Sequence, residues 1–309
     1  MNTSPQTASP SAVHPGPGHP QRRRWLGLGL GLGVLGAWGL MGCSTTTGRG
    51  LAPPASPLGR FAVTVDTQRV VSPPGWPQTL HADIYRPQVN TPQPAVLLIH
   101  GGGWAPPDRR HQMVSIAQRL AQRGYVVVNT TYRLAPEHLH PAPVQDLRQV
   151  LAWMRQHHAE LGLKPDRIAA FGYSAGGHLA ALLGAQPAPA HQQVQAVVAG
   201  GAPTELSKWS NGKLVVRYLG GTPTEVPQQY ADASPIRHVT AAHPPTFLYH
   251  GKWDTLVTVD HSTDYQAALD RAGVPNEMVL SGGKGHITAF VFDGAAIEAA
   301  ISFLDRTLR

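Results

Sequence analysis

The chain has 309 residues, of which 42% are apolar and 14% are charged, and it contains 25 Lys and Arg, 18 Asp and Glu and a single cysteine. A chain of this length can bury a large core without covalent cross-links. One cysteine excludes an internal disulfide, and it also excludes the metal and redox centres that need several thiols.

The first 42 residues have the layout of an export signal. Residues 1–21 contain five prolines and no acidic residue, three arginines follow, and residues 25–41 form an apolar run with six glycines. A charged segment followed by an apolar one is typical of a secretory signal peptide. The run is short and weakly hydrophobic for a membrane-spanning helix. Residues 1–42 are therefore predicted to be a signal peptide.

Cys43 follows this segment directly. Residues 40–43, Leu-Met-Gly-Cys, resemble the lipobox of bacterial lipoproteins, in which the cysteine is lipidated. Residues 21–26 also resemble a twin-arginine export signal, although a Sec signal carries arginines too. The resemblance implies a lipoprotein anchored to a membrane of the cell envelope through Cys43. An uncleaved anchor helix with an incidental Cys43 is the alternative, and it places the domain outside the cytoplasm as well.

Residues 43–60 are mostly Ser, Thr, Gly, Pro and Ala and lack apolar periodicity, which predicts a flexible tether. After residue 42 the Lys and Arg residues are scattered along the sequence, and only Arg109 and Arg110 are adjacent. Sites for nucleic acid cluster Lys and Arg with aromatic residues. No nucleic-acid partner is therefore expected.

Residues 61–309 are predicted to form one α/β domain. Residues 61–71 and 79–85 alternate apolar and polar residues around a Pro-Pro-Gly turn, as an antiparallel pair does. Five later segments are short apolar runs typical of strands covered on both faces, at residues 95–99, 125–129, 168–171, 194–199 and 246–249. Amphipathic helices are expected between them, at residues 110–123, 144–158 and 260–272. This alternation predicts a mostly parallel central sheet with helices on both faces.

In such a sheet the ligand site forms where the strands end. Gly172-Tyr173-Ser174-Ala175-Gly176 lies between a predicted strand and a helix rich in Ala and Leu. This is the context of a nucleophile elbow, which exposes a serine hydroxyl at the N-terminus of a helix. Ser174 is thus the candidate nucleophile, and the backbone N–H of Ala175 is a candidate donor to a developing oxyanion.

A second loop with candidate functional residues also follows a predicted strand. His100-Gly101-Gly102-Gly103-Trp104 follows residues 95–99, and glycine-rich loops of this type supply an oxyanion donor in lipases and esterases. It lacks the helix-starting signature of a nucleotide-binding loop, because Pro106 and Pro107 follow.

Asp254 and His286 supply an acid and a base after the strands ending at residues 249 and 281. A serine nucleophile needs a base within hydrogen-bond reach, and the base needs a carboxylate to orient it. The order Ser174, Asp254, His286 meets this need. Asp260 and Asp264 are competing candidates for the acid.

Four segments together resemble the hormone-sensitive-lipase-like and acetyl-xylan/feruloyl esterase-like (BD-FAE-type) group of α/β-hydrolases: HGGGW at 100–104, YRLAPE at 132–137, GYSAGGHLA at 172–180 and HGKWD at 250–254. Tyr173 stands where the hormone-sensitive-lipase-like pattern usually has Asp, which favours the acetyl-xylan/feruloyl esterase-like branch. No long helical cap precedes the first strand. Residues 204–234 are the expected partial cover, with aromatic residues that either line the pocket or pack the loop onto the body.

The resemblance implies a triad of Ser174, Asp254 and His286 and an oxyanion hole made by the N–H groups of Gly102, Gly103 and Ala175. Trp104 and Tyr173 are candidate substrate contacts. The expected activity is hydrolysis of short acyl esters, including acetyl or feruloyl esters of carbohydrate, with no metal and no cofactor. Two alternatives remain: an arylformamidase-like amidase of the same fold, and a catalytically inactive envelope binding module.

Overall fold

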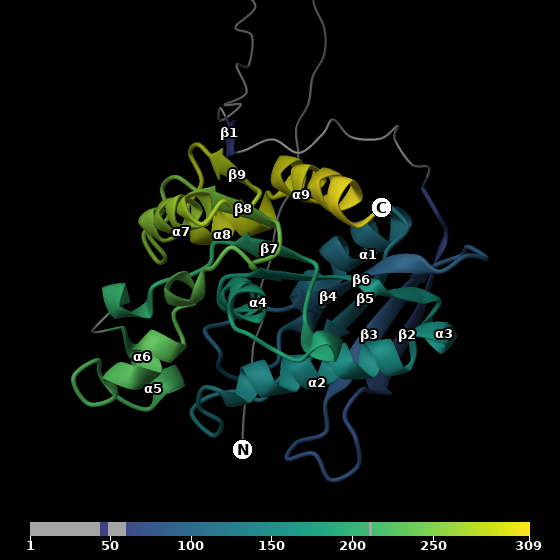
Figure 1. Ribbon diagram of the computed structural model, residues 1–309, viewed down its shortest axis with the longest axis horizontal. Helices are drawn as coiled ribbons and strands as arrows, with labels where there is room; N and C mark the ends of the chain where they lie inside the picture. The colour runs from purple at the N-terminus through teal and green to yellow at the C-terminus, as the bar shows by residue number, and fades with distance from the viewer. Residues whose placement is uncertain (1–43, 49–59, 210–211) are drawn as a thin grey trace, which may run out of the picture. The chain divides into compact units, whose positions relative to one another are not determined.

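The computed structural model describes residues 44–48, 60–209 and 212–309 (Figure 1). The predicted signal peptide at residues 1–42 and the predicted lipidation site at Cys43 lie outside the described residues, as does the tether from residue 49 to residue 59. Among the described residues, no helix combines the length and the apolar character needed to cross a membrane.

One sheet of nine strands organises the described chain, in the order β1-β9-β8-β7-β6-β4-β5-β3-β2. Strands β4 to β9 run parallel to one another, whereas β1, β2 and β3 are antiparallel additions at the two sides. The strands are β1 (Ser44–Gly48), β2 (Val63–Val70), β3 (His81–Pro87), β4 (Gln93–Ile99), β5 (Val126–Thr130), β6 (Leu163–Tyr173), β7 (Ala196–Gly200), β8 (Thr246–Gly251) and β9 (Asn276–Ser281).

Helices follow most of the parallel strands. The α-helices are α1 (Val114–Gln122), α2 (Ala142–Gln156), α3 (His158–Leu161), α4 (Ala175–Ala185), α5 (Lys213–Leu219), α6 (Pro227–Asp232), α7 (Asp260–Arg271), α8 (His286–Val291) and α9 (Gly294–Leu308). Short 3-10 helices are η1 (Arg110–Met113), η2 (Ala190–Gln192), η3 (Leu206–Trp209) and η4 (Pro235–His238).

The sheet has a hydrophobic core on each face. Helices α2, α4 and α7 cover one face, and α1 and α9 cover the other (Figure 1). Strand β4 supplies both cores, because Leu97 and Ile99 point to the first and Val96 and Leu98 to the second. Burial on both faces explains why its sequence is a continuous apolar run. The predicted architecture, a mostly parallel sheet covered on both sides, is confirmed.

The predicted tether differs from the structure in one part. Ser44–Gly48 forms β1, which pairs antiparallel with β9 in a register that sets Ser44 opposite Ser281. The Ser, Thr and Gly residues of β1 show no apolar alternation. None is needed, because the side chains of residues 45–48 are exposed and the pairing depends on backbone hydrogen bonds. These five residues therefore belong to the sheet.

Candidate active site

Ser174 occupies a sharp turn between β6 and α4. Its backbone has φ +55° and ψ −124°, a strained conformation for a residue with a side chain. The flanking glycines allow the turn to close: a Cβ at Gly172 would lie 2.2 Å from the backbone of Gly176, and one at Gly176 would lie 2.1 Å from the carbonyl oxygen of Ile99. The local sequence thus holds the Ser174 hydroxyl at the carboxyl end of the sheet.

Two loops bring a base and an acid to this hydroxyl. Nε2 of His286, the first residue of α8, lies 2.9 Å from Ser174 Oγ. Nδ1 of the same ring lies 2.6 Å from Oδ2 of Asp254, which follows β8. The three residues come from segments up to 112 positions apart in the sequence and form one continuous hydrogen-bonded chain.

Asp254 is buried and has several donors. Its Oδ1 accepts hydrogen bonds from the N–H groups of Leu256 at 2.9 Å and Val257 at 2.8 Å, and its Oδ2 lies 3.2 Å from Nε2 of His250. Burial alone would raise the pKa of Asp254, but the contacts with His250 and His286 outweigh it and hold that pKa well below its usual value. Asp254 is therefore an anion beside His286, the state that stabilises an imidazolium.

His250 is the supporting residue that the sequence analysis did not single out. Its ring is fully buried, with Nδ1 2.7 Å from Ser262 Oγ and Nε2 2.8 Å from the carbonyl of Val257. The carbonyl oxygen of Val257 can only accept, so Nε2 of His250 is the donor. The same N–H also faces Oδ2 of Asp254. A histidine four residues before the candidate acid, at the end of a strand, was the available signal.

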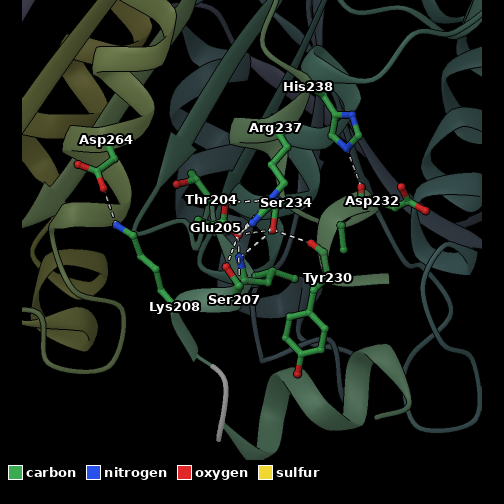
Figure 2. Close-up of polar contacts among 12 residues, drawn as sticks. Thr204, Glu205, Ser207, Lys208, Tyr230, Asp232, Ser234, Arg237, His238 and Asp264 are labelled. Carbon is green, nitrogen blue, oxygen red and sulfur yellow. Dashed lines mark hydrogen bonds and ion pairs between the residues drawn. The ribbon is translucent and has the colours of Figure 1, made fainter. Parts of the chain in front are cut away.

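The competing acids are engaged elsewhere. Asp260 and Asp264 on α7 lie 2.5 and 2.6 Å from Nζ of Lys208, the latter contact being drawn in Figure 2. Burial alone would lower the pKa of Lys208, but its contacts with these two carboxylates raise it. Both acids thus attach the segment that carries Lys208 to α7, and Asp254 is the one whose hydrogen bond reaches His286.

The glycine-rich loop lines the same pocket as Ser174 and His286. Gly102 and Gly103 have φ values of +110° and +63°, which glycine adopts readily. Ala175, at the start of α4, also lines this pocket, and the first N–H groups of a helix have no intrahelical acceptor. The predicted oxyanion donors and the serine hydroxyl thus share one pocket.

Trp104, a candidate substrate contact, is almost completely buried. Although it forms part of the pocket wall, only 1% of its surface is exposed, and its ring stacks on Tyr218 with centroids 4.4 Å apart. Its Nε1 donates to Nδ1 of His178 at 3.1 Å, while Nε2 of His178 faces the carbonyl of Ala233 at 2.7 Å. Trp104 therefore packs the oxyanion loop onto α4 and the insertion.

Tyr173 is also largely buried, with 4% of its surface exposed, and it forms part of the pocket wall. Its hydroxyl donates to the backbone carbonyl of His286 at 2.6 Å. Burial raises the pKa of this phenol, so it remains a donor. This hydrogen bond connects Tyr173, the residue before the nucleophile, to the backbone of the candidate base.

The described parts of the insertion, residues 204–209 and 212–234, contribute to the pocket wall. Trp209 lines the pocket, whereas Tyr218 and Tyr230 are buried and pack the insertion onto the body. Figure 2 shows the polar contacts at its base, where Glu205 contacts Ser207, Ser234 and Arg237. Of the two alternatives for these aromatic residues, lining the pocket applies to Trp209, and packing the insertion onto the body applies to Tyr218 and Tyr230.

The pocket has a volume of about 370 Å³. Beside the residues above, its wall is mainly apolar, with Leu214 from α5, Leu256 and the α8 residues Ile287 and Phe290. A space of this size with few polar groups at one end suits a small organic ligand. No group of three or more His, Cys, Asp or Glu side chains that could hold a metal ion occurs in the part of the chain that the structure describes.

A family model described as BD-FAE matches residues 82–269. The chain is 32% identical over 204 residues to the probable carboxylic ester hydrolase LipM of Mycobacterium tuberculosis, covering 60% of this chain and 47% of that protein. It is 29% identical to the esterase LipC of the same organism, covering 58% and 48%. The chain thus spans about half the length of the curated relatives it matches.

Solved structures share the fold. A truncated carbohydrate esterase from gut microbiota superimposes with a TM-score of 0.71 at 22% identity, covering 84% of this chain and all of that one, which bears on the fold alone. A bacterial heroin esterase superimposes with a TM-score of 0.67 at 28% identity, covering 82% and 87% of the two chains.

Proposed function

The chain belongs to the BD-FAE family and has the α/β-hydrolase fold, and from this premise we propose that it is a serine carboxylesterase acting on short acyl esters. The observation that carries the proposal is the hydrogen-bonded chain from Ser174 Oγ through His286 to the anionic Asp254. The names of the similar proteins, a probable carboxylic ester hydrolase and two esterases, support an ester as the substrate.

In the proposed reaction, His286 Nε2 takes the proton of Ser174 as Oγ attacks the ester carbonyl carbon. The carbonyl oxygen becomes an oxyanion, held by the N–H groups of Gly102, Gly103 and Ala175. Collapse of this intermediate breaks the bond to the alcohol, which leaves with the proton from His286. Water then attacks the acyl-enzyme by the same route and releases the acid. Asp254 stabilises the imidazolium in both halves.

The size of the pocket supports short acyl groups, and we propose acetyl or feruloyl esters of carbohydrate as substrates. An acyl-chain series of p-nitrophenyl esters, run beside acetylated xylan, tests this choice. Release of acetate from xylan with a steep fall in kcat/KM beyond short chains is expected. A rate that rises with long acyl chains would reject it.

Replacing the nucleophile tests the proposed activity. Ser174→Ala should abolish hydrolysis of p-nitrophenyl acetate and covalent labelling by a fluorophosphonate probe, because no other hydroxyl in the hydrogen-bonded chain can form the acyl-enzyme. The matched control is Ser115→Ala on α1, whose side chain is exposed and remote from the chain of contacts. Labelling that survives Ser174→Ala would reject Ser174 as the nucleophile. An unreactive wild-type protein would favour a binding module.

We also propose export and lipidation at Cys43, supported by the order of charged, apolar and lipobox-like residues at 22–43. Metabolic labelling with a fatty acid should mark the wild-type protein in the membrane fraction and should not mark Cys43→Ser. A labelled Cys43→Ser protein would contradict this assignment.

A further inference from the structure

We propose that the pocket contains an anion subsite formed by Arg109 and Arg217, so that the favoured substrates are esters carrying a carboxylate. This inference rests on the proposed esterase function and adds, among short acyl esters, a preference for those that carry a carboxylate. Both arginines line the pocket that holds Ser174 and His286.

Arg109 lies directly against the oxyanion loop. A Cβ built on Gly102 would lie 2.5 Å from Cδ and 2.6 Å from Nε of Arg109, so the absence of a side chain at Gly102 makes room for this arginine. Its Nε is buried and has no hydrogen-bond partner in the structure. Buried donors in folded proteins are nearly always paired, and an unpaired one at a pocket indicates a missing partner.

Arg217 reaches the same pocket from α5 of the insertion. Its neighbour Tyr218 stacks on Trp104, the residue that ends the glycine-rich loop. The packing that holds α5 against this loop therefore also brings the second guanidinium to the pocket. Arg217 is an exposed residue of this pocket wall.

Among the described residues, no carboxylate forms an ion pair with Arg109 or Arg217. The described residues that line the pocket include no Asp or Glu. Elsewhere, arginines such as Arg133 and Arg306 pair with carboxylates at 2.8 and 2.6 Å, but neither Arg109 nor Arg217 takes part in an ion pair within the described ranges. Both cations remain available to a ligand beside the reacting serine.

The chemistry of the two groups defines the ligand. A guanidinium is planar, always charged and suited to bidentate hydrogen bonds with a carboxylate. The apolar part of the wall, including Leu214 and Phe290, suits a short hydrocarbon segment between the carboxylate and the ester. Among short acyl esters, those whose acyl or alcohol part ends in a carboxylate are thus expected to react with the highest kcat/KM.

Isosteric substrate pairs test the subsite on the wild-type full-length protein. Monomethyl glutarate and methyl glutaramate place a carboxylate or a neutral amide on the acyl side. Acetoxyacetate and acetoxyacetamide do the same on the alcohol side. In at least one pair, kcat/KM for the anion should exceed that for the amide by about tenfold or more. The pair that shows the preference identifies the side on which the carboxylate lies. This preference should shrink as the ionic strength rises, because salt screens partly exposed charges.

Variants connect the preference to the two arginines. Arg217→Gln and Arg109→Gln should each reduce the ratio of kcat/KM between anion and amide several-fold, mainly through KM of the anion. Arg109→Lys retains the charge and should keep part of the ratio even if Arg109→Gln disturbs the loop. Arg271→Gln, at the exposed end of α7, is the matched control and should leave the ratio unchanged.

The outcomes separate this inference from the proposed function. Equal or faster hydrolysis of the amide in both pairs would overturn the anion subsite while leaving the esterase function intact. A wild-type preference that persists in Arg217→Gln and Arg109→Gln alike would also overturn it. Failure to hydrolyse any of the four esters or p-nitrophenyl acetate would instead reject the esterase function itself.

Discussion

The imidazole of His250 lies 3.2 Å from the same carboxylate oxygen of Asp254 that contacts His286. One oxygen thus faces two histidines, while the other oxygen accepts two backbone N–H groups. Every side of the carboxylate is held, which fixes both its charge and its orientation toward His286.

Removing this support should slow the reaction without preventing it. His250→Phe keeps a ring in the buried site but deletes the donor, and we expect kcat to fall about tenfold with little change in KM. His250→Gln restores a donor and should recover part of the loss. Steady-state kinetics on a short ester measure both. Equal kcat in the wild type and His250→Phe would show that the backbone donors alone suffice.

Replacing the acid should be far more damaging. Asp254→Asn no longer stabilises the His286 imidazolium and should lower kcat by about four orders of magnitude, as in other enzymes with this arrangement. Asp264→Asn is the control, since Asp264 binds Lys208. Near-normal turnover by Asp254→Asn, with a loss in Asp264→Asn, would transfer the acid role to α7.

The turn that carries Ser174 has no room for a methyl group at Gly176. In Gly176→Ala the new Cβ would meet the backbone oxygens of Ile99 and His100 at 2.1 and 2.7 Å, so strand or helix must move. We expect a loss of about 1–3 kcal/mol or more in the free energy of unfolding, together with loss of activity. Gly294→Ala, whose Cβ meets nothing within 4 Å, should be neutral. Urea unfolding compares the two, and a Gly176→Ala protein as stable and active as the wild type would contradict the geometry.

The buried indole should act through packing. Trp104→Phe keeps an aromatic ring on Tyr218 but leaves Nδ1 of His178 without its donor. The expected cost is about 1–3 kcal/mol in the free energy of unfolding. Trp253→Phe, at a site where 71% of the residue is exposed, provides the comparison and should cost little. If Trp104→Phe changed only KM and not stability, Trp104 would be a substrate contact after all.

Mild acid should destabilise the fold. Burial lowers the pKa of four histidines to about 4, 3, 4 and 4, namely His140, His178, His243 and His261. As the pH falls through 6.5 the unfolded chain protonates these rings while the folded chain keeps them neutral, so the unfolded state binds more protons. The free energy of unfolding should therefore fall between pH 6.5 and about pH 4, by up to about 1.4 kcal/mol per pH unit for each ring.

The slope of this pH dependence is measurable by urea unfolding at several pH values. His140→Gln can still bond the Tyr218 hydroxyl that His140 contacts and should reduce the slope by the share of one histidine. His111→Gln, at an exposed position, should leave it unchanged. A free energy of unfolding that stays constant from pH 7 to pH 4 would contradict the prediction.

Much of the fold and the candidate site was predictable because local patterns dictated it. Continuous apolar runs marked most of the strands covered on both faces. Ser174, Asp254 and His286 each follow a parallel strand, where such sheets place ligand sites. The burial of Trp104 was not predictable, because its partner Tyr218 is 114 residues away in an insertion without a strong pattern. The role of Arg109 likewise depends on the space that Gly102 leaves for it.

Strand β1 has a consequence for where the folded unit begins. It covers the outer side of β9 through the pairing of Ser44–Gly48 with residues 277–281. A chain shortened to start at residue 61, where apolar alternation begins, would leave the N–H and C=O groups of β9 exposed along an open edge. Such edges pair with other chains and promote aggregation. Pairing with Ser44–Gly48 thus covers this edge of β9, and we expect a protein that keeps these five residues to aggregate less than one that starts at residue 61.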